Sequence, residues 1–245
     1  MKRKDIPMSF EEFEKMEHPF GWKAEYWDGK AVLSPRDIHV KTKLSLTQRS
    51  LSNHFNLKPT HPSLKPQMIE AFYEAFEDSV EFCDWPQEKI REHAENNLKN
   101  YFDGFRGEPQ AVSVMAVEPN QDEIAGLVLF TNKKGSINLD LLFVKPLYQR
   151  QGMATEMVSF AVNQLFDQGI REVYSAYHVC NENSQKWHHS FGFEDIYDQF
   201  YIRMKFFWVQ HEIWRVKELG WNDRIKQLIQ EKDYWYSQLE DEWKF

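Results

Sequence analysis

Three apolar segments at the centre of the sequence follow one another with only short polar turns between them. Residues 111–118, 123–130 and 137–144 each have the length and the apolar composition of a β-strand. A segment with apolar residues at helical spacing follows over 153–169 and ends at Gly169. This order of elements predicts a mixed α/β domain.

The segments on either side continue the pattern. A short strand is predicted at 54–59, and helices are predicted to begin at Pro66 and Pro86, because proline suits the first helical turn. After the central helix we expect a strand at 171–179, a short helix at 183–191 and a strand at 200–209.

The first fifty residues are predicted to form an extension. Ser9 and Glu12 have the spacing of a capping box, which predicts a short helix. Asp28-Gly29 lies between two alternating segments and predicts a two-residue hairpin turn. Alternation of apolar and polar residues over 38–46 predicts a further strand.

The C-terminal residues are predicted to form a long amphipathic helix over 210–245. Its apolar seam consists of Trp221, Ile225, Leu228, Trp235, Leu239 and Trp243. The seam has three alternative interpretations: it packs on its own domain, it forms a contact in a homodimer, or it covers a substrate site as a lid. The predicted organisation is an extension over 1–50, a domain over 51–209 and a helical extension over 210–245.

The charge of the chain limits its partners. Lys+Arg number 30 and Asp+Glu 38, and the formal net charge of −8 argues against a general nucleic-acid binder. No apolar run reaches the ~20 residues that span a bilayer, and the first residues lack the apolar core of a secretory signal. Two cysteines indicate a reducing compartment. We therefore expect a cytoplasmic protein without nucleic-acid or membrane partners.

The stretch from Val144 to Thr155 carries the clearest chemical signal. A strand ends, a turn follows, and a helix begins close to Gly152. The first amides of a helix lack internal partners and attract anions, and glycine lets a phosphate approach the backbone closely. Arg150 and Lys145 add positive charge. The stretch predicts a phosphate cradle, although a plain strand–helix turn has the same pattern. It contains neither a Walker loop nor a dinucleotide fingerprint.

This stretch resembles a known family. Gln149-Arg150-Gln151-Gly152-Met153-Ala154 is similar to the Q/R-x-x-G-x-G/A motif of the GNAT superfamily of N-acetyltransferases. Some thirty residues later, Asn181 to Ser184 and His188 to Phe193 resemble the N-x-x-A/S and Y-x-x-x-G-F segments of that family. The resemblance covers about two thirds of the chain. It implies a mixed, mostly antiparallel central sheet flanked by helices.

The resemblance also implies a binding mode for acetyl-CoA between two strands that splay apart. Backbone groups of Leu142 and Val144 would bond the pantetheine arm in the manner of an added strand. The amide of Phe143 or Leu142 would stabilise the oxyanion. Asn181 would bond the pantetheine or position the loop before the next helix. The pyrophosphate would be held by the amides of Arg150, Gln151, Gly152, Met153, Ala154 and Thr155.

Two residues are candidates for proton transfer. Asp140 precedes the predicted splay, with the parity of Leu142 and Val144, and is a candidate base; the alternative is a solvated or hydrogen-bonded strand residue. His188 stands where many family members have a tyrosine acid. This departure makes His188 a candidate acid for the thiolate, and the alternative is a histidine packed beside Trp187.

Other reactive side chains have plainer explanations. His188 and His189 are adjacent and diverge on a helix, so no metal site is predicted. Cys180 is interpreted as buried filler rather than an acyl-accepting nucleophile, because no base partner is evident.

The predicted function is acetyl transfer from acetyl-CoA to a primary amine by direct attack in a ternary complex. The acceptor is a small molecule or a peptide, and the acidic chain favours a cationic one. An aromatic-lined acceptor pocket is one hypothesis, with residues such as Phe76, Trp85 and Tyr201 near it. The alternatives are a CoA-binding interaction protein without turnover and an acyltransferase that uses a longer acyl-CoA.

Overall fold

The computed structural model describes residues 4–118, 123–220 and 222–244. The described chain forms two compact units, each of which is discontinuous in sequence. The first unit contains residues 42–176 and 186–194, and the second contains 4–41, 177–185 and 195–244. The three consecutive segments predicted from the sequence are a different division and stay a prediction.

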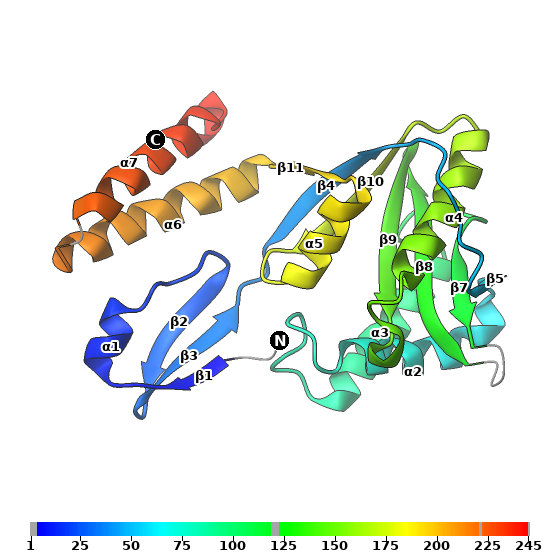
Figure 1. Ribbon diagram of the computed structural model, residues 1–245, viewed down its shortest axis with the longest axis horizontal. Coiled ribbons are helices and arrows are strands. Elements are labelled where there is room, and N and C mark those ends of the chain that lie inside the picture. The colour runs from blue at the N-terminus through cyan, green and yellow to red at the C-terminus, as the bar shows by residue number, and fades with distance from the viewer. Residues whose placement is uncertain (1–3, 119–122, 221, 245) are drawn as a thin grey trace. The chain divides into compact units, whose positions relative to one another are not determined.

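The first unit is built on a mostly antiparallel sheet with the strand order β11-β4-β10-β9-β8-β7-β5, in which β11 is Glu194–Ile196 (Figure 1). The short β6 pairs with β8. Strands β5, β7, β8 and β9 pair antiparallel, whereas β10 pairs parallel to β9. The strands are β4 (His39–Ser45), β5 (Asn56–Pro59), β6 (Glu108–Pro109), β7 (Val114–Val117), β8 (Ile124–Lys133), β9 (Ser136–Val144) and β10 (Glu172–His178). Strands β4 and β10 continue into the second unit.

Helices cover both faces of this sheet. On one face, α4 (Met153–Asp167) packs on Val128 and Phe130; on the other, α2 (Lys65–Phe76) and α3 (Gln87–Phe102) pack on Leu127 and Leu129. Because both faces of β8 are buried, its sequence is apolar without alternation. Helix α5 (Glu182–Phe191) begins in the second unit and ends in the first, and β11 (Glu194–Ile196) follows it. The predicted mixed α/β fold, a mostly antiparallel sheet flanked by helices, is confirmed.

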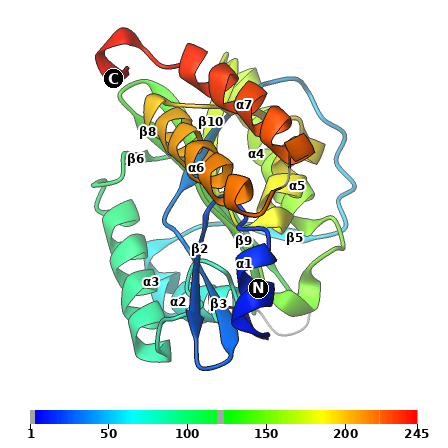
Figure 2. The ribbon, with the colours of Figure 1, turned by 90° about the vertical axis from the view of Figure 1, so that its left-hand side faces the viewer.

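The second unit contains a three-stranded antiparallel sheet in the order β1-β3-β2 and a pair of long helices. The helices α6 and α7 pack side by side (Figure 2). Asp28 and Gly29 form the predicted hairpin turn with φ angles of 48° and 72°. The predicted capping box is also present. The elements are β1 (Lys4–Pro7), α1 (Phe10–Lys15), β2 (Trp22–Trp27), β3 (Lys30–Pro35), α6 (Gln199–Glu218) and α7 (Asn222–Ser237).

The predicted strand at 200–209 is wrong, because this segment lies inside α6. Asp198 caps the helix and accepts a hydrogen bond from the Tyr201 amide at 2.9 Å. From Ile202 onward, the buried apolar residues recur at spacings of four and three, which is the helical period. The buried apolar residues are Tyr201, Ile202, Phe206, Val209, Ile213 and Val216.

The predicted single helix over 210–245 is also corrected. Helix α6 ends at Glu218, Gly220 takes a left-handed φ of 71°, and α7 begins at Asn222. Trp221 lies outside the described residues. The rest of the predicted seam packs within the second unit, as the first of its three interpretations states: Leu228, Trp235 and Leu239 are buried, with Ile225 and Trp243 against them. Among the described helices, none combines the length and apolar content needed to cross a membrane.

Candidate functional site

The turn between β9 and α4 exposes backbone amides at a helix N-terminus. Arg150 and Gly152 have left-handed φ angles of 60° and 84°, and Gly152 is the N-cap of α4. The first helical bond runs from the Glu156 amide to the Gly152 carbonyl, so the amides of Met153, Ala154 and Thr155 precede it. A Cβ built on Gly152 meets nothing within 4 Å. The space around Gly152 at the start of α4 is therefore open, and amides at a helix N-terminus attract anions.

The charge around this turn differs from the sequence prediction in one respect. Arg150 is exposed, but the Lys145 side chain is only 7% exposed and contacts Glu74 at 2.7 Å and also Glu123. Burial opposes protonation of Lys145, but the hydrogen bonds to Glu123 and Glu74 outweigh it and raise its pKa above the ordinary value. Lys145 is charged, and the two carboxylates neutralise it, so it does not add positive charge to the turn.

The last residues of β9 present backbone groups on the side away from β8. The Lys145 amide donates to Ala125 of the β8 side at 2.9 Å. Backbone groups alternate between the two edges of a strand, so those of Leu142 and Val144 point away from β8 and that of Phe143 points toward it. The Val144 carbonyl accepts a hydrogen bond from the Gln149 side chain at 3.0 Å.

Strand β10 lies on that open side, and its described pairing with β9 is the single pair Tyr174 and Asn138. Past Asn138 toward Val144, β9 continues for six residues. In the described part of the first unit, no further β10 residue is paired with this stretch. The backbone groups of Leu142 and Val144 therefore lie on the edge of β9 that faces away from β8.

Asp140 does not have the predicted parity. Leu129 pairs with Leu141 and Phe130 pairs with Leu139, so Asp140 is an extra residue in a β-bulge. The bulge reverses the alternation after it. Leu142 and Val144 pack on the α4 side, whereas Asp140 and Leu141 line a cavity on the α2–α3 side.

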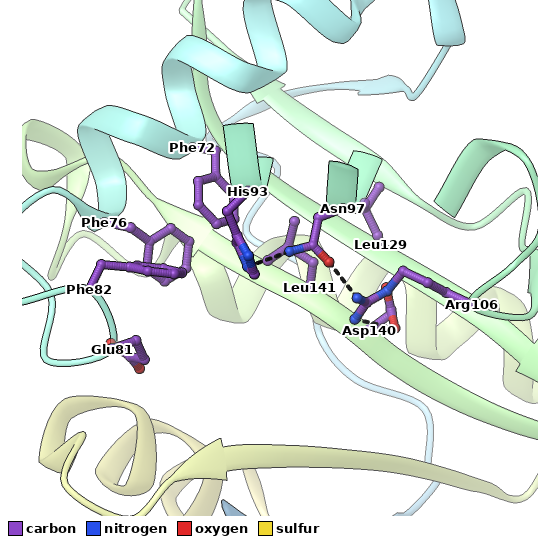
Figure 3. A pocket seen from close by; sticks show the side chains of 10 residues that line it. All are labelled: Phe72, Phe76, Glu81, Phe82, His93, Asn97, Arg106, Leu129, Asp140 and Leu141. Carbon is purple, nitrogen blue, oxygen red and sulfur yellow. Dashed lines mark hydrogen bonds and ion pairs between the residues drawn. The ribbon is translucent and has the colours of Figure 1, made fainter. Parts of the chain in front are cut away.

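Asp140 is held by an ion pair at this cavity (Figure 3). Arg106 donates from Nε to Asp140 Oδ2 at 2.7 Å and from Nη2 to Oδ1 at 3.1 Å. Its Nη1 donates to Asn97 Oδ1. Because the carbonyl of Asn97 faces Arg106, its amide nitrogen faces His93 Nε2 at 2.6 Å.

His93 is therefore a neutral imidazole with its proton on Nδ1, because Nε2 accepts the hydrogen bond from Asn97. Burial and then the positive charge of Arg106 lower the pKa of His93 below its ordinary value of 6.5. The ring packs against Phe82 and Trp85, with centroids at 5.1 and 5.4 Å.

The lowered pKa of His93 makes a prediction for stability. Below pH 6.5 the unfolded chain binds a proton at this residue more readily than the folded chain, so stability falls as the pH falls through this window. We expect His93→Gln to lose less unfolding free energy than the wild type between pH 7.5 and 5.5, measured by urea denaturation. His54→Gln, which changes an exposed histidine, is the control. An identical pH dependence in wild type and His93→Gln would contradict this prediction.

His188 lies on the inner side of α5 and is 3% exposed. Its Nε2 is 3.0 Å from Ser175 Oγ, and its ring contacts Trp187 and Phe193. These aromatic residues belong to the core on the α4 side of the sheet. The structure therefore does not bring His188 together with Asp140. The Asp140 side chain lines the cavity on the opposite, α2–α3 side of the sheet.

Asn181 and Cys180 belong to the second unit by sequence, whereas the other predicted site residues belong to the first. Asn181 Oδ1 accepts the Ser184 amide at 3.0 Å at the start of α5. Cys180 is buried, and its thiol donates to the Gly21 carbonyl at 3.2 Å, as expected for filler. Among the residues that the structure describes, no cluster of His, Cys, Asp or Glu is placed to hold a metal ion.

Most residues of the cavity were not identified in the sequence. Of the aromatic residues proposed for an acceptor pocket, Phe76 lines it, whereas Tyr201 belongs to the second unit. The apolar residues at helical spacing in α2 predicted the buried face of that helix, but they did not predict a cavity. The lining residues without a sequence signal are Glu81, Phe82, His93, Asn97, Arg106, Leu129 and Leu141.

Comparison with protein families finds a match to the part of the chain that contains this turn. A model of the acetyltransferase (GNAT) family matches residues 67–193, just over half of the chain, including β9, α4 and α5. No curated protein matches the sequence.

Solved structures with a similar fold are distant in sequence. A GCN5-related N-acetyltransferase from Sphaerobacter thermophilus is 14% identical with a TM-score of 0.47, over 64% of this chain and 48% of that one. This chain therefore matches about half the length of that protein. The PaiA N-acetyltransferase from Thermoplasma acidophilum, solved with coenzyme A, is 17% identical with a TM-score of 0.45, over 57% and 89%. The ribosomal-protein-S18-alanine N-acetyltransferase from Escherichia coli is 15% identical with a TM-score of 0.43, over 58% and 79%.

Proposed function

Because this chain belongs to the acetyltransferase (GNAT) family, we propose that it transfers an acetyl group from acetyl-CoA to a primary amine. The observation that supports the proposal is the N-terminus of α4, where a Cβ on Gly152 would meet nothing within 4 Å and the amides of residues 150–155 would hold the pyrophosphate. The exposed Arg150 adds a positive charge there.

The pantetheine arm would lie along the open edge of β9. The backbone groups of Leu142 and Val144 point to that edge and would pair with the arm as a strand pairs with its neighbour. Asn181 would act by fixing the loop before α5, since its side chain caps that helix. Because the Leu142 amide points to that edge and the Phe143 amide points toward β8, we assign the role of oxyanion donor to Leu142.

Acetyl transfer requires attack by a neutral amine nitrogen on the thioester carbon. A C–N bond forms, the C–S bond breaks, the nitrogen loses a proton and the thiolate gains one. Holding both reactants in one ternary complex supplies much of the rate. The roles of Asp140 as base and His188 as acid stay predictions.

A second function is favoured by the contacts of these two residues. Both oxygens of Asp140 accept hydrogen bonds from Arg106, and His188 is buried against Ser175. A protein that binds CoA without turnover would keep such contacts. The binding site for CoA is the same in both proposals, and turnover separates them.

Calorimetric titration with acetyl-CoA and with CoA, followed by free-thiol release with a panel of amines, tests the proposal. We expect dissociation constants on the order of micromolar and thiol release that depends on an added amine. Binding without thiol release for any amine would favour the CoA-binding protein. Absence of binding would contradict both functions.

A further inference from the structure

The turn between β9 and α4 begins with two residues whose side chains reach other elements. Lys145 is the first residue after β9, and Tyr148 ends the short 3₁₀ turn (Pro146–Tyr148) that follows. The Tyr148 amide donates to the Lys145 carbonyl at 2.9 Å, which fixes the spacing between the two residues. The contacts of their side chains therefore influence where the turn leaves the sheet.

Lys145 is held through both its backbone and its side chain. Its amide donates to the Ala125 carbonyl at 2.9 Å. Its ammonium group contacts Glu74 on α2 at 2.7 Å, and it also contacts Glu123, which immediately precedes β8. The Lys145 side chain is buried, and a buried charge requires such partners. Lys145 thus joins the start of the turn to α2 and to β8 at the same time.

Tyr148 is fastened at the same end of the sheet. Its hydroxyl donates to Glu118 Oε2 at 2.7 Å, and its ring packs against the core on the α4 side. The Glu118 amide in turn donates to the Glu123 carbonyl at 2.9 Å. The carboxylates that contact Lys145 and Tyr148 therefore include those of two residues that are bonded to each other, at the end of β7 and the start of β8.

The residues after Tyr148 need this support, because their backbone conformation is unusual. Arg150 and Gly152 have positive φ angles, and a residue other than glycine rarely adopts one. Such conformations persist where the surrounding structure holds them. On the downstream side, Met153 is buried in the core and fixes the first turn of α4. Lys145 and Tyr148 supply the corresponding support upstream.

The ion pairs of Lys145 are suited to fixing an orientation more than to adding stability. The cost of removing charges from water offsets much of their attraction. The side chains of Glu74 and Glu123 are 43% and 46% exposed, so both carboxylates remain hydrated if the lysine charge is removed. Loss of that charge should therefore loosen the turn without unfolding the first unit.

We propose that Lys145 is a positioning residue for the binding of CoA. Held between Glu74 and Glu123, it fixes the start of the turn so that the amides of residues 150–155 face the pyrophosphate. It acts through the backbone rather than by contact with the ligand, because its charge is committed to the two carboxylates. The inference rests on the proposed function, in which this turn binds CoA.

Calorimetric titration of the full chain with CoA tests this role. We expect Lys145→Met to raise Kd at least about tenfold, and Lys145→Arg, which keeps the charge, to stay within about threefold of the wild type. Lys205→Met is the matched control. Lys205 in α6 is another lysine with a mostly buried side chain, and its Nζ lies 3.5 Å from Glu231. We expect this control to bind CoA as the wild type does.

The double variant Glu74→Gln, Glu123→Gln distinguishes positioning from a direct attraction between Lys145 and the phosphate. If Lys145 acts by position, the double variant should also raise Kd at least about tenfold. If its ammonium group attracts the pyrophosphate directly, removing the two neighbouring carboxylates should strengthen binding instead. Because both glutamates are half-exposed, this variant keeps the test decisive if Lys145→Met does not fold.

The outcomes separate this inference from the proposed function. Wild-type affinity in folded Lys145→Met, or tighter binding by the double variant, overturns the positioning role while CoA still binds. A Lys145→Arg variant that binds as weakly as Lys145→Met overturns it as well, because the charge would then not be what holds the turn. Absence of CoA binding by the wild type would instead overturn the proposed function, and this inference with it.

Discussion

Replacing Gly152 with glutamate is expected to lower the affinity for acetyl-CoA at least about 100-fold, measured by calorimetry. The new carboxylate would occupy the space in front of the α4 amides, where nothing lies within 4 Å of a Cβ. Two effects add there: the side chain excludes the pyrophosphate, and like charges placed together cost several kcal/mol, where about 1.4 kcal/mol is a tenfold change.

The backbone strain of this variant needs its own control, because Gly152 has a φ of 84°. Gly135 in the β8–β9 turn has a φ of 87° and is equally open, so Gly135→Glu adds the same charge and the same strain elsewhere. Gly152→Ala adds strain without charge. We expect both controls to keep affinity within about threefold of the wild type. Wild-type affinity in folded Gly152→Glu would refute the phosphate cradle.

The features predicted correctly from the sequence are local ones. The Asp28-Gly29 turn needs left-handed φ angles at two adjacent residues, and the capping box needs only Ser9 and Glu12. The strand–turn–helix segment at Gly152 is of the same kind, since its elements are consecutive, whereas its role in holding a phosphate stays a prediction. Such features depend mainly on residues that are close in the sequence, so a sequence pattern predicts them.

The features that the sequence did not reveal depend on distant contacts. The segment 200–209 is apolar at positions that fit either period, and its burial among α7 and β-strand residues of the second unit selects the helix. The bulge at Asp140 is visible only in the pairing of β9 with β8. The cavity collects residues from α2, α3, β8, β9 and the segments that follow α2 and α3, and no spacing rule connects residues so far apart in the sequence.

A second large effect is expected in α6, where Arg215→Met should lower the free energy of unfolding by about 3–5 kcal/mol. The Arg215 and Glu212 side chains are 10% and 7% exposed and pair at 2.8 Å. Arg215 Nη1 also donates to the Glu14 carbonyl at 2.9 Å. Methionine keeps the length of the side chain but leaves the Glu212 carboxylate buried without this cation. Urea denaturation at neutral pH measures the loss.

A double variant distinguishes the cost of leaving a buried charge unpaired from the cost of lost packing. If the stranded Glu212 carboxylate causes the loss, Glu212→Leu combined with Arg215→Met should recover most of it, because a buried ion pair is replaced by apolar side chains at little net cost. Lys15→Met, which breaks the exposed pair with Glu11, should change stability by less than about 1 kcal/mol. A double variant as unstable as Arg215→Met would show that packing by the arginine, and its bond to Glu14, account for the effect.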